Sequence, residues 1–544
     1  MWIMIGAGKP QWTVFRHNGP FFPPLYEPHK TYVLFKNNKI ILPPEAEEYA
    51  TMYAKYLDTE YVKNPKFNKN FFNDFKKVLP KDLQDSRLED FNFSKIKKYI
   101  DKVSENKKNM SKEEKESIKK ENEKIEEPYM YCIIDGSRQR VGNYKVEPPG
   151  IFLGRGDHPK IGMVKKRINP EDIILNLDNT SPAPAPTPKI NIDMNNSMKW
   201  GDIIHDDSVI WLATWKDTIT GKNKYIFTSM ESIFKSKSDE SKFDLAIKLK
   251  KKVNSIRHQY EKQLTSEDDR IKQLATALYI IDNLALRVGG KKDKREEADT
   301  VGVTSLRVEH ISLLPPNIIK LDFLAKDSVR FCKKINVIKP VFDNINMFIT
   351  NKNKKDQLFD LINANSVNSY LDNFMKGLTA KVFRTYNASY IFQKELDKIN
   401  EDRLKLIHES EKINYIITMF NQANTTVALL CNHQKSVSGK FDEIIEKINK
   451  KIKELKKKKK LYEEKKNKEL SQKIESKIKL LRLKLDQKTK MKNVSLGTSK
   501  MNYIDPRIIF AFMKRFNIPS DKLFTSTLLK KFTWASEVDS SFRF

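Results

Sequence analysis

Ser499-Lys500-Met501-Asn502-Tyr503-Ile504-Asp505-Pro506-Arg507 places a tyrosine directly ahead of an Asp-Pro pair. Aspartate is a favoured N-cap and proline a favoured first helical residue, so the pair predicts a helix that begins at Pro506. Tyr503 then lies on the turn before that helix, where its hydroxyl can reach into a cleft. A phenol has an unperturbed pKa of about 10 and is a poor nucleophile. It becomes useful only where several cations stabilise the charge that forms.

Four upstream segments offer such cations, and each also has a plain structural interpretation. They are residues 284–290, 323–328, 377–387 and 430–434. Arg287 follows an apolar helix and suits the negative end of its dipole. Lys326 suits the tip of a solvated hairpin. Lys381 and Arg384 are spaced to share one solvated helix face. His433 suits a helix-capping position. Taken singly, each segment favours its plain interpretation.

The charge and composition of the chain indicate a polyanionic partner. The chain has 544 residues and a formal net charge of +31, and at ~100–200 residues per domain several domains are expected. A hydrophobic content of 39% with 31 Phe, 19 Tyr and 6 Trp is enough to build sizeable cores. The basic excess favours nucleic acid first and an anionic membrane surface second. A general lysine bias is the alternative, and the run Lys456–Lys460 fits it.

Several classes of site find no support in the sequence. The three cysteines, Cys132, Cys332 and Cys431, form no CxxC pair, so neither disulfides nor a zinc site are expected and a reducing compartment fits. No apolar run reaches the ~18 residues of a membrane span. The chain contains no GxxxxGK[ST] phosphate-binding loop and no convincing acidic metal cluster.

Hydropathy patterning divides the chain into stretches of different character. Residues 1 to about 100 predict mixed strands, turns and short helices, and residues 104–127 predict a solvated helix. Strand-like pieces follow over 128–230, interrupted by a stiff extended loop at 181–186. Helical patterns dominate from about 240 to 435, with a strand-like insert around Ile318–Ile338.

The stretch 441–490 predicts two antiparallel helices that form a coiled-coil hairpin. Ile448, Ile452 and Leu455 recur at heptad-like spacing, and a second set of apolar residues further along the chain shows the same spacing. That set comprises Leu470, Ile474, Ile478, Leu481 and Leu485. A dense charge patch between the two sets contains the expected turn, near Glu463–Lys468. From Val494 onward the composition is globular again.

Four more stretches add to those already quoted, at 147–152, 154–160, 299–302 and 305–310. In this order, the segments resemble the eukaryotic type IB DNA topoisomerases, the nuclear, monomeric kind. The likeness runs from about Trp12 to Phe544, with the charged hairpin matched least well. The resemblance implies an enzyme that relaxes supercoiled DNA by nicking one strand, allowing rotation and resealing it.

The resemblance also implies a role for each cation. Tyr503 is expected to attack a DNA phosphodiester and hold the 3′ phosphate covalently. Arg287, Arg384 and His433 are expected to bind the non-bridging oxygens of the transition state, and arginine's planar fork suits such oxygens. Lys326 is expected to protonate the departing 5′ hydroxyl. The phosphotyrosine conserves bond energy, so the resemblance implies no requirement for ATP and no essential divalent metal.

Further positions match those with which the family contacts DNA. They are Lys107, Arg155, Lys224, Tyr225, Lys242, Thr300, Asp327, Asn368, Thr379, Lys381 and Asn502. Most such contacts are expected to reach phosphates, which position a duplex without reading its sequence. Double-stranded DNA is therefore the expected partner, bound by a monomer with steep salt dependence. The residues that match Arg155, Asp327 and Asn502 lie where camptothecin-type poisons trap this family, so sensitivity is also expected.

The implied fold is a multidomain α+β clamp. Residues 1–225 are expected to form a mixed α/β DNA-binding cap with the first part of the core. Residues 226–435 form a mostly helical catalytic lobe like that of tyrosine recombinases, and residues 436–493 a coiled-coil linker. Residues 494–544 form a small helical C-terminal domain that carries Tyr503. Nuclear location is expected from the family alone, because the chain begins almost at its globular part, without the family's charged N-terminal extension.

Two alternatives share the DNA partner. A tyrosine recombinase would use the same chemistry but would form stable multimers on paired sites, and the long cap region argues against it. A non-catalytic DNA clamp would require that at least one of the five residues is lost or misplaced, and the sequence contains all of them.

Overall fold

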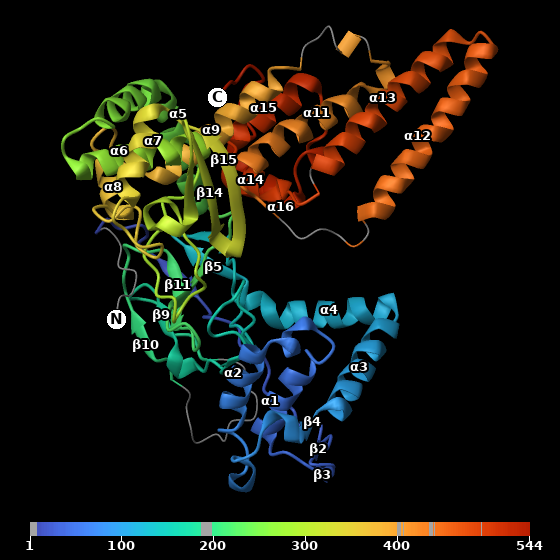
Figure 1. The fold of residues 1–544 in the computed structure, drawn as a ribbon. Helices are drawn as coiled ribbons and strands as arrows, with labels where there is room; N and C mark the ends of the chain where they lie inside the picture. The colour runs from blue at the N-terminus through green and yellow to red at the C-terminus, as the bar shows by residue number, and fades with distance from the viewer. Residues whose placement is uncertain are drawn as a thin grey trace. The chain divides into compact units, whose positions relative to one another are not determined.

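The chain folds into two compact units. The computed structural model describes residues 8–186, 199–399, 404–405, 407–434, 439, 441–490 and 492–544. The first unit runs to Lys235 and also includes Lys292–Asp299; the second comprises Ser236–Lys291 and Thr300–Phe544. Figure 1 shows the course of the chain through helices and strands of both units.

In its described residues, the first unit contains the helices α1 to α4, the start of α5 (Ile233–Gln263) and four small sheets. Its helices are α1 (Pro44–Ala54), α2 (Pro65–Phe75), α3 (Ser94–Asn109) and α4 (Lys112–Glu126). Its strands are β1 (Phe15–His17), β2 (Val33–Phe35), β3 (Asn38–Ile40), β4 (Phe91–Asn92), β5 (Tyr131–Ile134), β6 (Ser137–Arg140), β7 (Gly150–Ile151), β8 (Val164–Lys165), β9 (Ile174–Asn176), β10 (Asp202–Ile204), β11 (Trp211–Lys216) and β12 (Asn223–Phe227). The strand orders are β1-β5-β6, β3-β2-β4, β10-β9-β11-β12 and β7-β8.

Aromatic side chains build the core around α2. Phe67, Phe71 and Phe75 recur at the spacing of one helix face and are fully buried. The helix begins where the sequence provides for it, because the Asn64 side chain accepts from the Lys66 amide and Pro65 is the first helical residue. A second core lies under the sheets and includes Trp12 and Trp215. The expected mixture of strands and short helices is confirmed.

The charged stretch 104–127 is not one helix, as the sequence predicted, but the end of α3 and all of α4. Ser111 interrupts it. The Ser111 hydroxyl accepts from the Glu114 amide, and the Glu114 carboxylate accepts in return from the Ser111 amide. The first amides of a helix have no partner within the helix, and this capping box supplies partners for two of them. A new helix therefore starts at Ser111.

The second unit is mostly helical. Its helices are α5 (Ile233–Gln263, which begins in the first unit), α6 (Asp269–Leu284), α7 (Lys339–Ile349), α8 (Ala364–Asp372), α9 (Ala380–Leu396), α11 (Glu409–Leu430), α12 (Phe441–Glu464), α13 (Lys468–Lys490), α14 (Leu496–Asn502), α15 (Pro506–Phe516) and α16 (Ser526–Lys531). An antiparallel sheet accompanies them, with strands β13 (Ile311–Leu314), β14 (Ile318–Ala325) and β15 (Val329–Asn336) in that order. The predicted strand-like insert is therefore β14 and β15.

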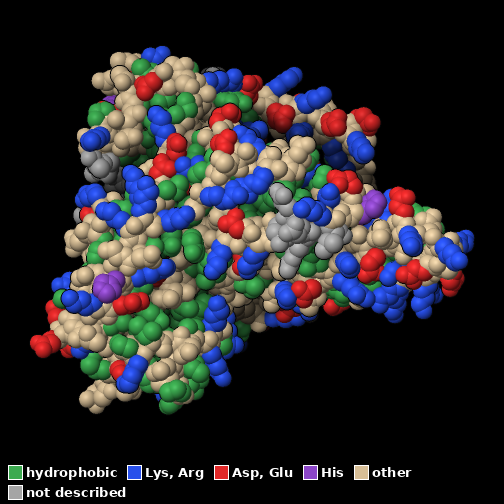
Figure 2. Space-filling view, turned by 90° about the horizontal axis from the view of Figure 1, so that it is seen from above, with side chains coloured by type: hydrophobic (Ala, Val, Ile, Leu, Met, Phe, Trp, Pro, Cys, Tyr) green, Lys and Arg blue, Asp and Glu red, His purple; other side chains and the backbone are tan. Residues whose placement is uncertain are grey.

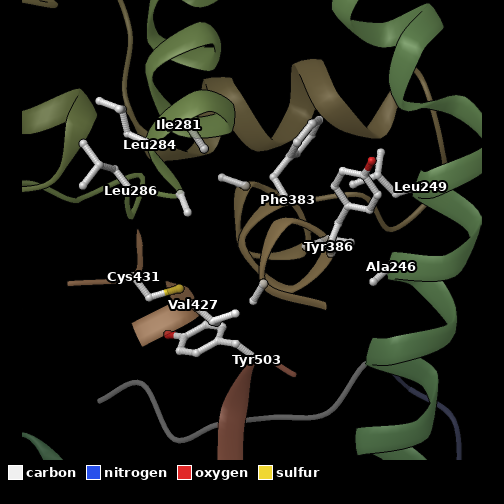
Figure 3. Close-up of a cluster of buried hydrophobic side chains, with 14 of the residues drawn as sticks. Ala246, Leu249, Ile281, Leu284, Leu286, Phe383, Tyr386, Val427, Cys431 and Tyr503 are labelled. Carbon is white, nitrogen blue, oxygen red and sulfur yellow. The ribbon is translucent and has the colours of Figure 1, made fainter. Parts of the chain in front are cut away.

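One large core joins α5, α6, α9, α11 and α15. The predicted apolar face of α6 is buried along its length, from Leu274 to Leu286. One buried polar group within this core is well paired: the Asp282 carboxylate on α6 accepts from Arg257 on α5 and from Asn387 on α9. Figure 3 shows Phe383 and Tyr386 of α9 in this core, together with side chains of α5 and α6. Helix α9 is thus surrounded on most sides, which fixes its position.

Helices α12 and α13 form the predicted hairpin and run side by side in Figure 1. Ile452, Ile474 and Ile478 are buried in the seam between them. The turn falls between Glu464 and Lys468, within the range that the charge pattern indicated. Lys459 forms an ion pair with Glu463 on its own helix and another, across the seam, with Glu475 on α13.

Basic side chains are scattered over the face seen in Figure 2, with acidic side chains among them. No helix in the described part of the chain is both long and apolar enough to cross a membrane. The loop Ser181–Pro186 has no regular secondary structure, and its continuation over 187–198 lies outside the described residues.

Two glycines fix the loop that follows α6. Helix α6 ends at Leu284, and Ala285 takes a left-handed conformation with φ of 48°. Beyond it, Gly289 has φ of +86°, and a Cβ built there would lie 2.7 Å from the backbone of Gly302. The close approach allows the amides of Val303 and Thr304 to donate to the carbonyls of Arg287 and Val288. The loop that carries Arg287 is therefore held by backbone contacts that only glycine permits.

Replacing Gly289 with alanine tests this close approach. We expect Gly289→Ala to lower the free energy of unfolding of the second unit by about 1–3 kcal/mol, because alanine is strained at positive φ and its methyl group meets backbone. Gly290→Ala is the matched control, since a Cβ at Gly290 meets nothing within 4 Å. Denaturant titration of both variants measures the difference. Equal stability of the two variants would contradict the close packing of Gly289 on Gly302.

Candidate active site

Tyr503 lies in a buried setting lined by cations. It is the residue that follows the last turn of α14, and its side chain is only 8% exposed. The Arg384 guanidinium carbon lies 4.7 Å from the centre of the phenol ring, and the His433 ring stacks on it with centroids 5.3 Å apart. Arg287 Nη2 donates to the Tyr503 hydroxyl at 3.4 Å. Three basic side chains from separate segments therefore surround one phenol.

Backbone hydrogen bonds hold Tyr503 from both sides. The Ser499 carbonyl accepts from the amides of Tyr503 and Ile504. The Ser389 hydroxyl on α9 donates to the Tyr503 carbonyl at 3.1 Å and accepts from the Asp505 amide at 3.0 Å. Asp505 caps α15 by accepting from the Arg507 amide, and Pro506 is the first helical residue, as the sequence predicted. The turn at Tyr503 is thus anchored to the helix that carries Arg384.

Arg384 is buried at the centre of the site, with 4% of its surface exposed. Its Nη1 donates to the Ala285 carbonyl at 3.0 Å and its Nη2 to the Cys431 carbonyl at 2.5 Å. Its Nε is also buried but has no hydrogen-bond partner among the described residues. The solvated-face interpretation is therefore wrong for Arg384, whereas Lys381, one turn earlier, is exposed. The helix places the two cations in different environments because α9 is packed on most sides.

His433 is positioned by the way α11 ends. Asn432 has φ of 52°, the Asn432 amide donates to the Leu429 carbonyl, and the His433 amide donates to the Ala428 carbonyl. This pair of bonds is a Schellman motif, which reverses the chain after a helix. The capping interpretation is therefore correct for the His433 backbone. Its side chain is 6% exposed and turns toward Tyr503 and Arg384.

The imidazole of His433 is neutral at ordinary pH. Burial, together with the nearby charges of Arg384 and Arg287, lowers the pKa of His433 from 6.5 to about 3. Its Nδ1 lies 2.8 Å from the Ser499 hydroxyl, and its Nε2 lies 3.3 Å from Arg384 Nη2. Burial also raises the pKa of the adjacent Cys431 thiol. Neither group adds charge to the site, so its cationic character comes from the arginines.

Lys326 is placed on the turn between β14 and β15, as the sequence predicted. The turn is tight because Asp327 and Ser328 both take left-handed conformations, with φ of 66° and 58°. Lys326 is exposed, and no hydrogen bond or ion pair within the described ranges joins it to the other four residues. The hairpin is nevertheless tied to the site. The side-chain amides of Asn432 and Gln434, which flank His433, both donate to the Arg330 carbonyl on β15.

The positions expected to contact DNA are divided between the two units. Four lie in the first unit: Lys107 on α3, Arg155 between β7 and β8, and Lys224 and Tyr225 on β12. Lys107 and Arg155 are exposed, and Lys224 forms ion pairs with Glu147 and Asp217.

Seven such positions lie in the second unit: Lys242, Thr300, Asp327, Asn368, Thr379, Lys381 and Asn502. Burial lowers the pKa of Lys242, and the neighbouring Asp239 opposes that shift. Thr300 is buried, whereas Asp327, Lys381 and Asn502 are exposed. Asn368 accepts from the Ala380 amide, one residue beyond Thr379, which precedes α9. In the part of the chain that the structure describes, no three His, Cys, Asp or Glu residues form a possible metal site.

Comparison with known proteins identifies the family. The models of the eukaryotic DNA topoisomerase I DNA-binding fragment, of its catalytic core and of the C-terminal topoisomerase domain match residues 10–228, 231–466 and 475–544. DNA topoisomerase 1 beta of Arabidopsis thaliana is 41% identical over 99% of this chain, which spans 60% of that relative. DNA topoisomerase 1 of Candidozyma auris is 38% identical over 99% of the chain and 84% of the relative. DNA topoisomerase 1 of Homo sapiens is 40% identical over 98% of the chain and 72% of the relative.

The chain therefore belongs to the eukaryotic DNA topoisomerase I family, the type IB DNA topoisomerases, which are isomerases. The match to the DNA-binding fragment identifies DNA as the partner. These matches support a DNA topoisomerase rather than a tyrosine recombinase or a non-catalytic DNA clamp. The five residues of the expected site all belong to the second unit.

Three residues that hold the site together carry no signal in the sequence. Ser389 and Ser499 are ordinary helical serines, and Lys531 lies in a short basic run. Lys531 is only 5% exposed; it donates to the Met501 carbonyl at 3.0 Å and lies 3.3 Å from the Asp239 carboxylate. The last carbonyls of a helix have no amide partner within that helix. Lys531 satisfies one of those of α14, the Met501 carbonyl, two residues before Tyr503. Only the packing of α5, α14 and α16 reveals this contact.

Removing the Lys531 ammonium tests the anchor. We expect Lys531→Met to lower the free energy of unfolding by about 1–3 kcal/mol, because it removes one of the two cations beside the buried Asp239 and leaves the Met501 carbonyl without its donor, while Lys242 stays paired with Asp239. Lys530→Met is the control, since Lys530 is exposed. Thermal and denaturant unfolding of the two variants give the comparison. If both variants are as stable as the native protein, the Asp239–Lys531 pair contributes nothing.

Proposed function

We propose that this member of the eukaryotic DNA topoisomerase I family relaxes supercoiled DNA through a transient single-strand break held on Tyr503. One observation carries the proposal: Arg287, Arg384 and His433, from three distant segments, converge on the Tyr503 side chain. A phenol that served only for packing would not need three cationic or polar partners at one ring. DNA is the substrate that supplies a phosphodiester to such a site.

Cleavage exchanges one phosphate ester for another. The Tyr503 hydroxyl oxygen attacks the phosphorus and loses its proton to water, the bond to the 5′ oxygen breaks, and the 3′ phosphate stays on the enzyme as a phosphotyrosine. Negative charge accumulates on the two non-bridging oxygens, where Arg287, Arg384 and His433 donate hydrogen bonds. Donors aimed at developing charge usually contribute more to catalysis than any other single effect, and the loss of one costs about 2.7–4 kcal/mol.

Arg384 is the donor best prepared for this task. Its two terminal nitrogens are held by the carbonyls of Ala285 and Cys431, so the guanidinium plane is fixed before DNA arrives. Its Nε is a buried donor without a partner among the described residues, which is costly in a folded protein. A phosphate oxygen would satisfy that donor with a charge-assisted bond.

Lys326 completes the reaction as general acid. It gives a proton to the departing 5′ oxygen and takes one back when the 5′ hydroxyl attacks the phosphotyrosine. Resealing regenerates the phosphodiester at the expense of the phosphotyrosine ester, so the cycle uses no ATP. The arginines provide the positive charge at the phosphate, so a divalent metal is not essential.

The finer architecture is part of the same proposal. Residues 1–225 serve as the DNA-binding cap and the first part of the core, and residues 226–435 as a catalytic lobe like that of tyrosine recombinases. Residues 436–493 serve as a coiled-coil linker and 494–544 as the C-terminal domain, and together these parts act as a clamp on a duplex. The positions named above contact mainly phosphates, so affinity falls steeply as salt rises. We further propose that the enzyme works as a monomer in the nucleus and is poisoned by camptothecin-type compounds.

Plasmid relaxation tests the reaction. We expect the native chain to relax supercoiled plasmid in EDTA without ATP, and we expect Tyr503→Phe to relax none. The variant removes one hydroxyl and keeps the ring between His433 and Arg384. Gel electrophoresis of topoisomers gives the readout. Relaxation that survives in Tyr503→Phe would remove Tyr503 as the nucleophile.

Lys326→Ala tests the general acid. We expect single-turnover cleavage of a nicked duplex to slow by about 10²–10⁴-fold, the usual contribution of a positioned acid. The dissociation constant for DNA should hardly change, because Lys326 is one of many cations that the duplex meets. Lys334→Ala, an exposed lysine on β15 of the same hairpin, is the matched control. A comparable loss of DNA binding in Lys326→Ala would assign Lys326 to binding instead.

A further inference from the structure

Ser499 links the two partners of the proposed reaction, Tyr503 and His433. Its side chain is fully buried on α14, and its hydroxyl lies 2.8 Å from His433 Nδ1. Its carbonyl accepts from the amides of Tyr503 and Ile504. One residue therefore fixes the turn that holds the nucleophile and also faces the ring that stacks on it.

The contacts of His433 define where its proton lies in this structure. A guanidinium has only donors, so Arg384 Nη2, 3.3 Å from His433 Nε2, requires Nε2 to accept. The neutral imidazole then carries its proton on Nδ1, and Nδ1 donates to the Ser499 hydroxyl oxygen. The groups that face this ring are Arg384, Arg287, Tyr503 and Ser499.

The proposed function requires the opposite arrangement. To donate a hydrogen bond to a phosphate oxygen, His433 must carry its proton on Nε2, and Nδ1 must then accept. A serine hydroxyl can both donate and accept, and it changes between the two by rotation about its Cβ–Oγ bond. Ser499 is therefore able to serve both forms of the ring, which an alanine or a backbone carbonyl could not.

We propose that Ser499 is a positioning residue that allows His433 to change tautomer when DNA binds. A phosphate oxygen takes the place of Arg384 at Nε2. Nε2 gains a proton from water and Nδ1 returns one to water, so the ring stays neutral. The Ser499 hydroxyl then turns and donates to Nδ1, and Nε2–H donates to the phosphate oxygen. This inference rests on the role proposed above for His433.

A double-mutant cycle separates this role from simple packing. Ser499→Ala should slow single-turnover cleavage by roughly 10–100-fold, the range found for groups that orient a metal-bound histidine, with DNA affinity unchanged. In a His433→Gln background the same substitution should cost little more, because residues that act as one unit are not additive. Ser495→Ala is the matched control, since the Ser495 hydroxyl on the same segment faces Thr498 rather than His433.

Two results would overturn the proposal. One is native cleavage by Ser499→Ala; the other is an equal loss in both backgrounds, which would indicate a structural role alone. If native protein fails to cleave, or His433→Gln cleaves normally, the proposed function of the site fails instead.

Nitrogen NMR provides a measurement that does not depend on how Ser499→Ala folds. The ring nitrogens of His433 are labelled with ¹⁵N in Tyr503→Phe and assigned by comparison with Tyr503→Phe/His433→Gln. We expect the proton on Nδ1 without DNA and on Nε2 with a bound duplex. A proton that stays on Nδ1 in the complex, or nitrogens that are both protonated there, would contradict the tautomer change.

Discussion

The buried guanidinium of Arg384 is the contact on which the site depends. It joins the end of α6, through the Ala285 carbonyl, to the end of α11, through the Cys431 carbonyl. It also lies over the ring of Tyr503. Loss of either carbonyl would leave one more buried donor of this cation without a partner, which is costly in a protein interior. The apolar packing of α9 fixes the helix, and the two hydrogen bonds of Arg384 fix the guanidinium within the site.

The electrostatics of the site follow from the same burial. Two arginines lie beside the Tyr503 ring, and desolvation together with their charge keeps His433 neutral. Buried cations without carboxylate partners are expensive, and within the described residues Arg384 has carbonyl partners and one unpaired donor. Such a site is better suited to an anion that arrives from outside than to the free protein. A phosphodiester, which gains negative charge as it reacts, matches that requirement.

Much of the local structure could be predicted from sequence pattern. The cap at Asp505, the face of α6, the turn at Lys326 and the seam of α12 and α13 all depend on spacing between near neighbours. The charge pattern over 104–127 predicts a solvated helix in kind but not in extent, because the capping box at Ser111 starts a second helix within it. The environment of Arg384 was also beyond prediction from the segment alone, since Lys381 and Arg384 look alike in sequence but differ in burial.

By itself, the sequence determined the family, the five expected site residues and the local turns that carry them, because these are encoded in contiguous motifs. Tertiary structure alone decided that Arg287, Arg384 and His433 meet at Tyr503. It alone revealed Ser389, Ser499 and Lys531 as the supports of that arrangement. The physical reason is that a hydrogen bond needs a partner within about 3 Å. Residues separated by tens to hundreds of positions reach that distance only through the packing of the helices between them.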